Sequence, residues 1–299
     1  MSPDCGFMTA TVHIPVMLDE VLQWLEPRAG KVLVDGTLGG GGHTRALAER
    51  VGPDGFVLAL DRDPAAIERA SEQLRGLPVQ LANRSFRELP EVLAELGRQQ
   101  VDGVLLDLGL SSDQLADPER GFSYESTGPL DLRFDPDAGE PAWRLLEYLS
   151  EKAIADLIYA YGEERCSRRI ARRIVERRKS EPLQTSAELA ALVRSCVPRS
   201  KNHRIDPATR TFQALRIAVN DELGALSAFL KKLPECLAPG GRCVIISFHS
   251  LEDRIVKNAF RDDRRWSALT KKPVLPRDIE VARNPRSRSA KLRVAARAT

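Results

Sequence analysis

A glycine-rich segment flanked by two acidic residues carries the strongest chemical signal in this sequence. Asp35 is followed by Gly36, Thr37 and Leu38, and then by four consecutive glycines and His43. Glycines tolerate positive φ and let a ligand approach the backbone closely, and a helix that starts there offers free N–H groups. Asp61 ends the next expected strand, where a carboxylate accepts hydrogen bonds from ribose hydroxyls. This spacing predicts a site for a cofactor that contains adenosine.

Two details favour S-adenosylmethionine over a nicotinamide dinucleotide as that cofactor. Asp35 lies directly before the glycines, where a carboxylate can meet the methionine ammonium but would repel a pyrophosphate. A Leu-Ala-Pro-Gly-Gly turn at residues 237–241, before a buried strand, is frequent in methyltransferases. A nicotinamide-dependent oxidoreductase stays open as an alternative, although the segment lacks a clean G-x-G-x-x-G spacing.

Further candidates follow the later strands, because loops at the carboxyl ends of parallel strands form the ligand crevice. Phe86 flanks an adenine or packs in the core, and Asp107 is an active-site acid or a helix cap. Ser111 follows Asp107 in the same loop, and His249 and Ser250 end the fifth expected strand. These side chains are the candidates for accepting a proton or a hydrogen bond during catalysis.

The elements that must position these residues alternate regularly in the first third of the chain. Short apolar strands are expected at 31–35, 55–61, 79–82 and 101–107, and helices at 16–25, 43–50, 64–74 and 89–96. This alternation predicts an α/β fold with a doubly wound, mostly parallel sheet. A fifth buried strand is expected within residues 237–248, after a long helix that starts at Asp206.

The pattern breaks between these two regions. Residues 117–141 are rich in Gly, Pro, Asp and Ser, and residues 142–197 show only helical periodicity. We therefore expect one sheet interrupted by an all-helical domain, with a first core part at 1–115, a substrate-recognition insertion at 116–205 and a second core part at 206–299. The long helix has its apolar face at Phe212, Leu215, Val219, Leu223, Leu226 and Leu230. Residues 261–299 are expected to form a basic tail with one edge strand at 292–295.

Composition excludes several classes of protein. The chain has 299 residues and a net charge of only +3, without an apolar run of the roughly 20 residues that cross a bilayer. The lack of such a run predicts no membrane partner. Five scattered cysteines show no zinc spacing, which predicts no metal and a reducing cytoplasm. They are Cys5, Cys166, Cys196, Cys236 and Cys243.

Motifs spread along nearly the whole chain resemble one family, the bacterial ribosomal RNA small-subunit methyltransferase H family, also called MraW. They lie at residues 13–22, 35–43, 60–64, 105–112, 120–123, 128–133, 161–165, 207–216, 245–256 and 284–289. The resemblance implies a Rossmann-like class I methyltransferase that transfers a methyl group from S-adenosyl-L-methionine to N4 of a cytidine in the decoding region. It implies cofactor contacts at Gly41, Gly42, His43, Asp61, Phe86, Asp107 and Gln114, and Gly40 of the same glycine run is a further candidate. Residues 261–282 are shorter than the matching stretch in many members.

The implied reaction sets requirements of its own. The cytosine amine is a poor nucleophile, so the site must align it and accept a hydrogen bond from it; Asp107, Ser111, His249 and Ser250 are the candidates. The target base must leave its stack, which calls for an aromatic platform. Phe122, Tyr124 and Phe134 suit that role, although core packing is open to them too.

Clusters of basic residues predict a nucleic-acid partner. Arginines crowd residues 165–179 on a helix with an apolar face at Cys166, Ile170 and Ile174, and more basic residues follow at Arg199, Lys201, Arg204, Arg210 and Arg216. The expected partner is small-subunit ribosomal RNA within the assembled small subunit. A third hypothesis, a ribosome-assembly factor that binds RNA without catalysis, stays open.

Overall fold

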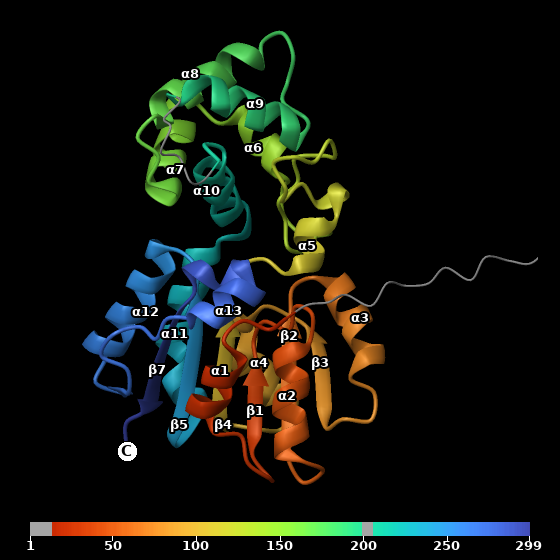
Figure 1. Ribbon diagram of the computed structural model, residues 1–299, viewed down its shortest axis with the longest axis vertical. Coiled ribbons are helices and arrows are strands. Elements are labelled where there is room, and N and C mark those ends of the chain that lie inside the picture. The colour runs from red at the N-terminus through yellow and green to blue at the C-terminus, as the bar shows by residue number, and fades with distance from the viewer. Residues whose placement is uncertain (1–13, 199–205) are drawn as a thin grey trace, which may run out of the picture.

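A computed structural model describes residues 14–198 and 206–299, and a single sheet organises the chain (Figure 1). Among these residues the sheet has seven strands in the order β3-β2-β1-β4-β5-β7-β6. The first five are parallel and β7 is antiparallel to both neighbours. Their bounds are β1 (Val32–Asp35), β2 (Phe56–Asp61), β3 (Val79–Asn83), β4 (Val101–Asp107), β5 (Leu237–Ser247), β6 (Trp266–Ala268) and β7 (Lys291–Arg297). The order 3-2-1-4-5 is that of a Rossmann-like sheet, so the predicted fold class is confirmed.

Helices cover both faces of this sheet. Leu58 and Leu60 of β2 point to a face covered by α4 (Leu89–Glu95), α11 (Glu222–Cys236) and α12 (Ser250–Asp262). Val57 and Ala59 point to the other face, covered by α1 (Leu18–Leu25), α2 (Gly42–Val51) and α3 (Pro64–Gln73). The strands are apolar at successive positions because alternate side chains meet different helical layers.

A helical insertion interrupts the sheet between β4 and β5. It contains α6 (Ala142–Tyr148), α7 (Glu151–Gly162), α8 (Ser167–Arg177), α9 (Ser186–Cys196) and α10 (Thr209–Asn220), with α5 (Ser112–Ala116) at its entrance. Ile154, Ile158, Ile170 and Ile174 are fully buried in a core of its own. In Figure 1 the insertion stands above the sheet, on the side to which the arrowhead of β1 points.

The single long helix expected after Asp206 is wrong, because it is two helices. Asp221 has a left-handed backbone with φ of 49° and separates α10 from α11. Phe212 and Leu215 of α10 belong to the core of the insertion, whereas Leu226 of α11 packs on the sheet. Apolar periodicity continues across the break because both halves bury one face, each in a different core.

The basic tail expected at residues 261–299 is also wrong in part. The segment folds into α13 (Asp278–Arg283), a 3-10 turn (Pro285–Ser289) and β7, which is interior, while β6 forms the edge. Leu292 and Val294 are fully buried, and Arg293 is 6% exposed beside Asp253. The strand expected at 292–295 is present as β7, but its expected place at the edge is wrong, because β6 pairs with its outer side.

In the part of the chain that the structure describes, no helix is both long and apolar enough to cross a bilayer.

Candidate functional site

A cavity of about 330 Å³ lies at the carboxyl ends of β1, β2 and β4. This volume is at the lower end of the range for small-molecule sites, ~300–1,000 Å³. The structure brings most of the predicted site residues to its wall: Gly40, Gly42, His43, Asp61, Phe86, Asp107, Ser111 and Gln114. Asp35, Gly41, His249 and Ser250 are not among the residues that line it.

The glycine loop leaves β1 and turns over the ends of the neighbouring strands. Gly39 and Gly41 have φ of 49° and 77°, which explains why glycine stands at both positions. The backbone of Leu38 donates to Leu60 O, 2.9 Å away, which ties the loop to β2. Gly36 has no room for a side chain, because a Cβ there would lie 2.4 Å from Cδ2 of Leu106. Gly41 is the N-cap residue of α2 and does not line the cavity.

Asp35 lies beneath this loop and is fully buried. Its carboxylate accepts hydrogen bonds from the Thr44 hydroxyl at 2.7 Å and from the Thr37 backbone at 3.1 Å. The Thr37 hydroxyl in turn accepts from the Asp107 backbone at 2.6 Å. Asp35 therefore holds the loop in place from below, and direct contact with a methionine ammonium is left to other groups.

Asp61 faces the cavity from the end of β2. Its two carboxylate oxygens accept hydrogen bonds from Gly39 N and Asp63 N, both at 2.9 Å. Burial raises the pKa of Asp61 to about 6, against the lowering effect of these two bonds, and the charges of Asp63 and Asp35 raise it further. Asp63 provides the N-cap of α3 through a bond from Ala65 N. Asp61 keeps unused lone pairs for donors from a ribose.

Phe86 combines the two roles considered for it. Its ring packs edge-on against Phe229 of α11, with the ring centroids 5.3 Å apart, and it also lines the cavity. The hydrophobic core therefore fixes the ring that an adenine would contact.

Asp107 is the most unusual charged group in the cavity. Its Oδ1 is buried without a hydrogen-bond partner, and its Oδ2 lies 3.7 Å from Nδ1 of His43. Desolvation by burial raises the pKa of Asp107 well above its usual range, helped by the charges of Asp35, Glu252 and Glu280. A bound cation would restore the ionised form. The residue therefore fits a ligand that brings an ammonium or sulfonium group.

Three other residues of the cavity wall, His43, Ser111 and Gln114, form hydrogen bonds with the rest of the protein. Nε2 of His43 lies 2.9 Å from the carbonyl of Val16, so it is the nitrogen that donates. Ser111 and Gln114 form a capping box that starts α5, and Nε2 of Gln114 donates to Asp63 at 3.0 Å. The Ser111 hydroxyl accepts a hydrogen bond from the backbone N–H of Gln114, so the hydroxyl's own proton remains available to point into the cavity.

His249 and Ser250 lie at the start of α12, outside the cavity wall. His249 is the N-cap: its Nδ1 accepts from Glu252 N at 3.4 Å, and its Nε2 lies 3.1 Å from Oε1 of Glu252. Ser250 donates to Glu163 at 2.9 Å. Both ring nitrogens of His249 thus face groups on its own helix. The sequence missed Glu252, which lines the cavity; a capping-box spacing from residue 249 to 252 was the available signal.

One group within the described residues has the composition of a metal site, namely Glu222, His249 and Glu252. Its oxygen donors are already engaged. Arg216 donates to both carboxylate oxygens of Glu222, at 2.8 and 3.0 Å, and Glu252 accepts from Phe248 N. Burial raises the pKa of Glu222, while His249 and Arg216 hold that of Glu252 low. The cluster is a charge network that supports one wall of the cavity.

Two segments that are far apart in the sequence contribute to the wall of the cavity. Val16 near the start and Arg283, Pro285 and Arg286 near the end all line it. Arg286 donates to the Ser112 hydroxyl, which attaches the C-terminal segment to α5. The motif at residues 284–289 is therefore a wall of the site, a role that a tail in the sequence did not indicate.

Comparison with known proteins places the chain in a family. The model of the MraW methylase family matches residues 10–298. A protein named ribosomal RNA small subunit methyltransferase H from Rhodopirellula baltica is 54% identical over 96% of this chain and 92% of that one. Its namesake from Thermomicrobium roseum is 49% identical over 96% and 94%. A solved rRNA methylase from Streptococcus thermophilus aligns over 94% of both chains, with a TM-score of 0.44 and 12% identity. The resemblance seen in the motifs is confirmed, and the chain belongs to the MraW methylase family.

Proposed function

We propose that this protein methylates N4 of a cytidine in the decoding region of small-subunit ribosomal RNA. As a member of the MraW methylase family it is a methyltransferase that uses S-adenosylmethionine. The observation that carries the proposal is the buried, unpaired Oδ1 of Asp107 in a cavity beside the glycine loop. A cationic cofactor supplies the missing partner there. The names of the relatives supply the substrate class.

We assign each part of the cofactor to different residues of the cavity wall. Asp61 takes the ribose hydroxyls, Phe86 takes the adenine edge, and Asp107 takes the methionine ammonium. The backbones of Gly40 and Gly42 and the ring of His43 border the methionine part. Asp35 acts through the loop: it sets the geometry of Thr37, which holds the Asp107 backbone.

For catalysis we retain Asp107 and Ser111 and set aside His249 and Ser250, which do not line the cavity: His249 caps α12, and Ser250 donates to Glu163. Bound S-adenosylmethionine supplies a methyl group activated by a positively charged sulfur. As the N4–methyl bond forms and the sulfur–methyl bond breaks, the electron pair of the broken bond stays on sulfur, and the methylated amine releases one proton to solvent. Ser111 accepts a hydrogen bond from the amine and aligns it. Asp107 is partly committed to the ammonium, so Ser111 is the better-placed acceptor.

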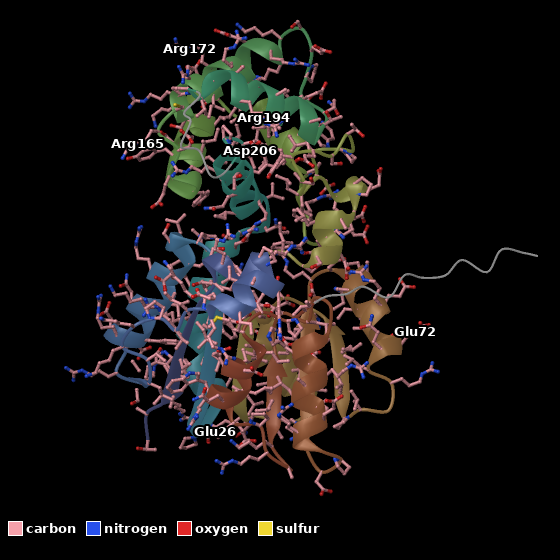
Figure 2. All side chains as sticks on the ribbon, viewed as in Figure 1. Glu26, Glu72, Arg165, Arg172, Arg194 and Asp206 are labelled. Atoms are coloured by element: carbon pink, nitrogen blue, oxygen red, sulfur yellow. The ribbon has the colours of Figure 1, made fainter. Side chains whose placement is uncertain are left out.

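Basic surfaces on the helical insertion provide the RNA-binding face. Figure 2 shows Arg165 and Arg172 projecting from the outer side of the insertion. Arg172 lies 3.8 Å from Glu151, whereas Arg165 and Arg168 form no ion pair with any residue in 14–198 or 206–299. Unpaired arginines suit phosphate contacts. Arg199, Lys201 and Arg204 of the second predicted cluster lie outside the described residues.

We further propose that the recognition unit extends beyond the expected 116–205. Helix α10 packs in the core of the insertion through Phe212 and Leu215, so its functional boundary falls at Asn220. The proposed substrate is the assembled small subunit in the cytoplasm, because a protruding helical unit can contact the subunit while the core holds the cofactor.

The test measures methyl transfer from S-adenosylmethionine to small subunits of a strain that lacks this methylation, with mass spectrometry of the nucleosides. The proposal expects N4-methylcytidine with wild-type protein and far less of it with Asp107→Asn when S-adenosylmethionine is below saturation. Free ribosomal RNA, tested in parallel, decides between naked and assembled substrate. NADH binding without affinity for S-adenosylmethionine would establish the oxidoreductase instead. RNA binding without any methyl transfer would establish an assembly factor.

A further inference from the structure

Residues 132–134 of the helical insertion reach back to the cavity, where Phe134 is part of the wall. Leu132 has φ of 64°, a conformation that leucine rarely adopts and that persists only where the surroundings impose it. Two buried side chains contact this segment from either side: Arg120 and Asn220, which are 9% and 3% exposed.

Asn220 holds both ends of the segment. Its Nδ2 donates to the carbonyl of Leu132, and its Oδ1 accepts from the backbone of Phe134, both at 2.7 Å. Its own carbonyl accepts from Arg62, next to Asp61, at 2.8 Å. The break between α10 and α11 therefore positions an amide that fixes the backbone on both sides of residue 133.

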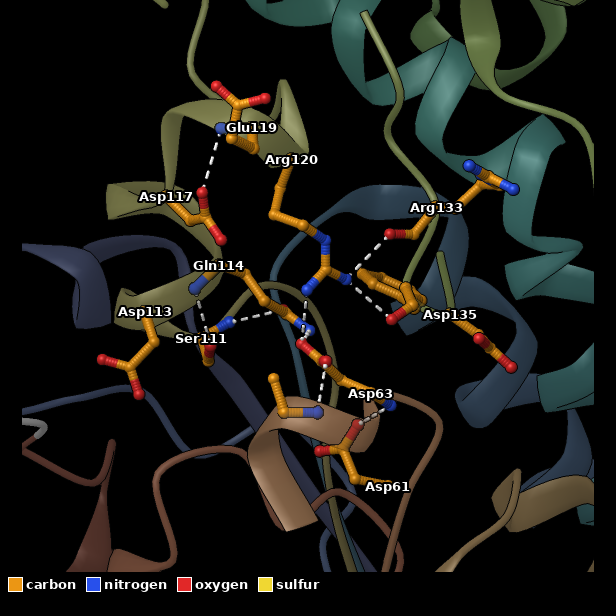
Figure 3. Close-up of polar contacts among 12 residues, drawn as sticks. Asp61, Asp63, Ser111, Asp113, Gln114, Asp117, Glu119, Arg120, Arg133 and Asp135 are labelled. Atoms are coloured by element: carbon orange, nitrogen blue, oxygen red, sulfur yellow. Dashed lines mark hydrogen bonds and ion pairs between the residues drawn. The ribbon is translucent and has the colours of Figure 1, made fainter. Parts of the chain in front are cut away.

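Arg120 links the same segment to the strand end that carries Asp61 (Figure 3). Its Nη2 donates to the carbonyls of Arg133 and Phe134 at 3.0 and 2.7 Å. Its Nη1 pairs with Oδ2 of Asp63 at 3.0 Å. The Asp63 backbone donates to Asp61 at 2.9 Å. One guanidinium thus joins the insertion to the turn that we assign to the ribose.

The Phe134 ring has a defined orientation as well. It stacks on Phe122, with centroids 5.8 Å apart and planes 28° from parallel, and Phe122 is a core residue that is 5% exposed. Tyr124, the third aromatic considered as a platform, packs against Phe212 in the core of the insertion. Of the three, Phe134 alone lines the cavity.

We propose that Phe134 is a cofactor-binding residue supplied by the helical insertion, which packs on the adenosine of the cofactor opposite Phe86. Arg120 and Asn220 are its positioning residues. This inference rests on the proposed assignment of the cavity to S-adenosylmethionine. The unit that recognises RNA also completes the cofactor site, so its placement on the core sets the affinity for the cofactor.

The experiment measures binding of S-adenosylhomocysteine and of adenosine to the full chain by calorimetry, together with KM and kcat of methyl transfer. Phe134→Leu keeps apolar bulk but removes the aromatic face. It should weaken both ligands alike by about tenfold, within the range for loss of aromatic stacking on a base. KM for S-adenosylmethionine should rise equally, with kcat at saturation preserved. Arg120→Met should reproduce this rise, and Arg120→Lys should recover part of it.

Arg133→Met is the matched control. Arg133 belongs to the same segment, but its guanidinium pairs with Asp131 at 2.7 Å within the insertion. The Arg133→Met protein should bind both ligands with wild-type affinity. Circular dichroism and thermal unfolding establish that each variant is folded. Folded Phe134→Leu protein with wild-type affinity would overturn the inference even if Arg120→Met failed to fold. A wild-type protein that binds neither ligand would instead overturn the proposed function.

Discussion

The raised pKa of Asp61 predicts that adenosine binds more weakly in acid. The ionised carboxylate can accept hydrogen bonds from both ribose hydroxyls, whereas the protonated group has lost one acceptor site to its own proton. With the pKa of the free protein at about 6, Asp61 is ionised at pH 8 and mostly protonated at pH 5. Adenosine is the probe because it lacks the amino-acid part that we assign to Asp107.

The size of the effect follows from the ionised fraction. If only the ionised form binds, the apparent Kd rises as that fraction falls, so affinity at pH 5 is about tenfold weaker than at pH 8. At pH 7 and above the affinity should be flat. The shift from 3.8 to about 6 also means that keeping Asp61 ionised costs the empty protein about 3 kcal/mol. The sign follows from linkage: the folded state binds the proton more tightly, so the free energy of unfolding falls as pH rises from about 4 to 6.

Calorimetric titrations of adenosine between pH 5 and 8 measure this dependence. Asp61→Asn should bind weakly at every pH and show no break near pH 6, while Asp54→Asn, an exposed position at the opposite end of β2, should behave as the wild type. A wild-type affinity that is constant from pH 5 to 8, or a break that survives in Asp61→Asn, would refute the reasoning.

Three further outcomes are expected. Asp107→Asn should weaken S-adenosylhomocysteine at least tenfold, because a hydrogen bond to a charged group contributes ~1.5–3 kcal/mol, yet leave adenosine nearly unchanged; equal losses in calorimetry would contradict the ammonium assignment. Gly36→Ala should lower the free energy of unfolding in urea by ~1–3 kcal/mol, since its Cβ would lie 2.4 Å from Leu106 and 3.0 Å from Phe86. An unchanged urea midpoint would show that these two side chains move aside without cost. Native protein should be alkylated at Cys166 before Cys243, whose pKa is strongly raised by burial; peptide mapping that finds Cys243 labelled first would show that β5 opens.

The sequence was sufficient for the sheet, because each parallel strand is a short apolar run followed by a polar residue at its carboxyl end. Asp61 and Asp107 were found in this way, and both end at the cavity. The sequence was insufficient for the break at Asp221, since the apolar periodicity is the same whether one helix packs on a single core or two helices pack on two cores. Only the left-handed backbone at that residue separates α10 from α11.

The candidate site was predictable where function depends on local chain geometry and not where it depends on distant segments. The glycine loop is local and lies where its motif placed it, between β1 and α2. The capping box formed by Ser111 and Gln114 is also local. Part of the cavity wall is not local: Val16 and Arg286 come from opposite ends of the chain. His249 looked catalytic because it follows a strand, but the first turn of α12 uses its ring as a cap.

Asp63 shows why the link between the insertion and the core escaped the sequence. Asp63 is the N-cap of α3, and a single oxygen, Oδ1, provides that cap by accepting from Ala65 N. Its second oxygen, Oδ2, accepts from Gln114 and Arg120, and the side chain is only 1% exposed. A cap on a surface helix needs no cation, whereas a carboxylate buried to this degree does. Burial therefore makes Arg120 a requirement of the core rather than a surface arginine, and it couples the insertion to the cofactor turn for the same reason.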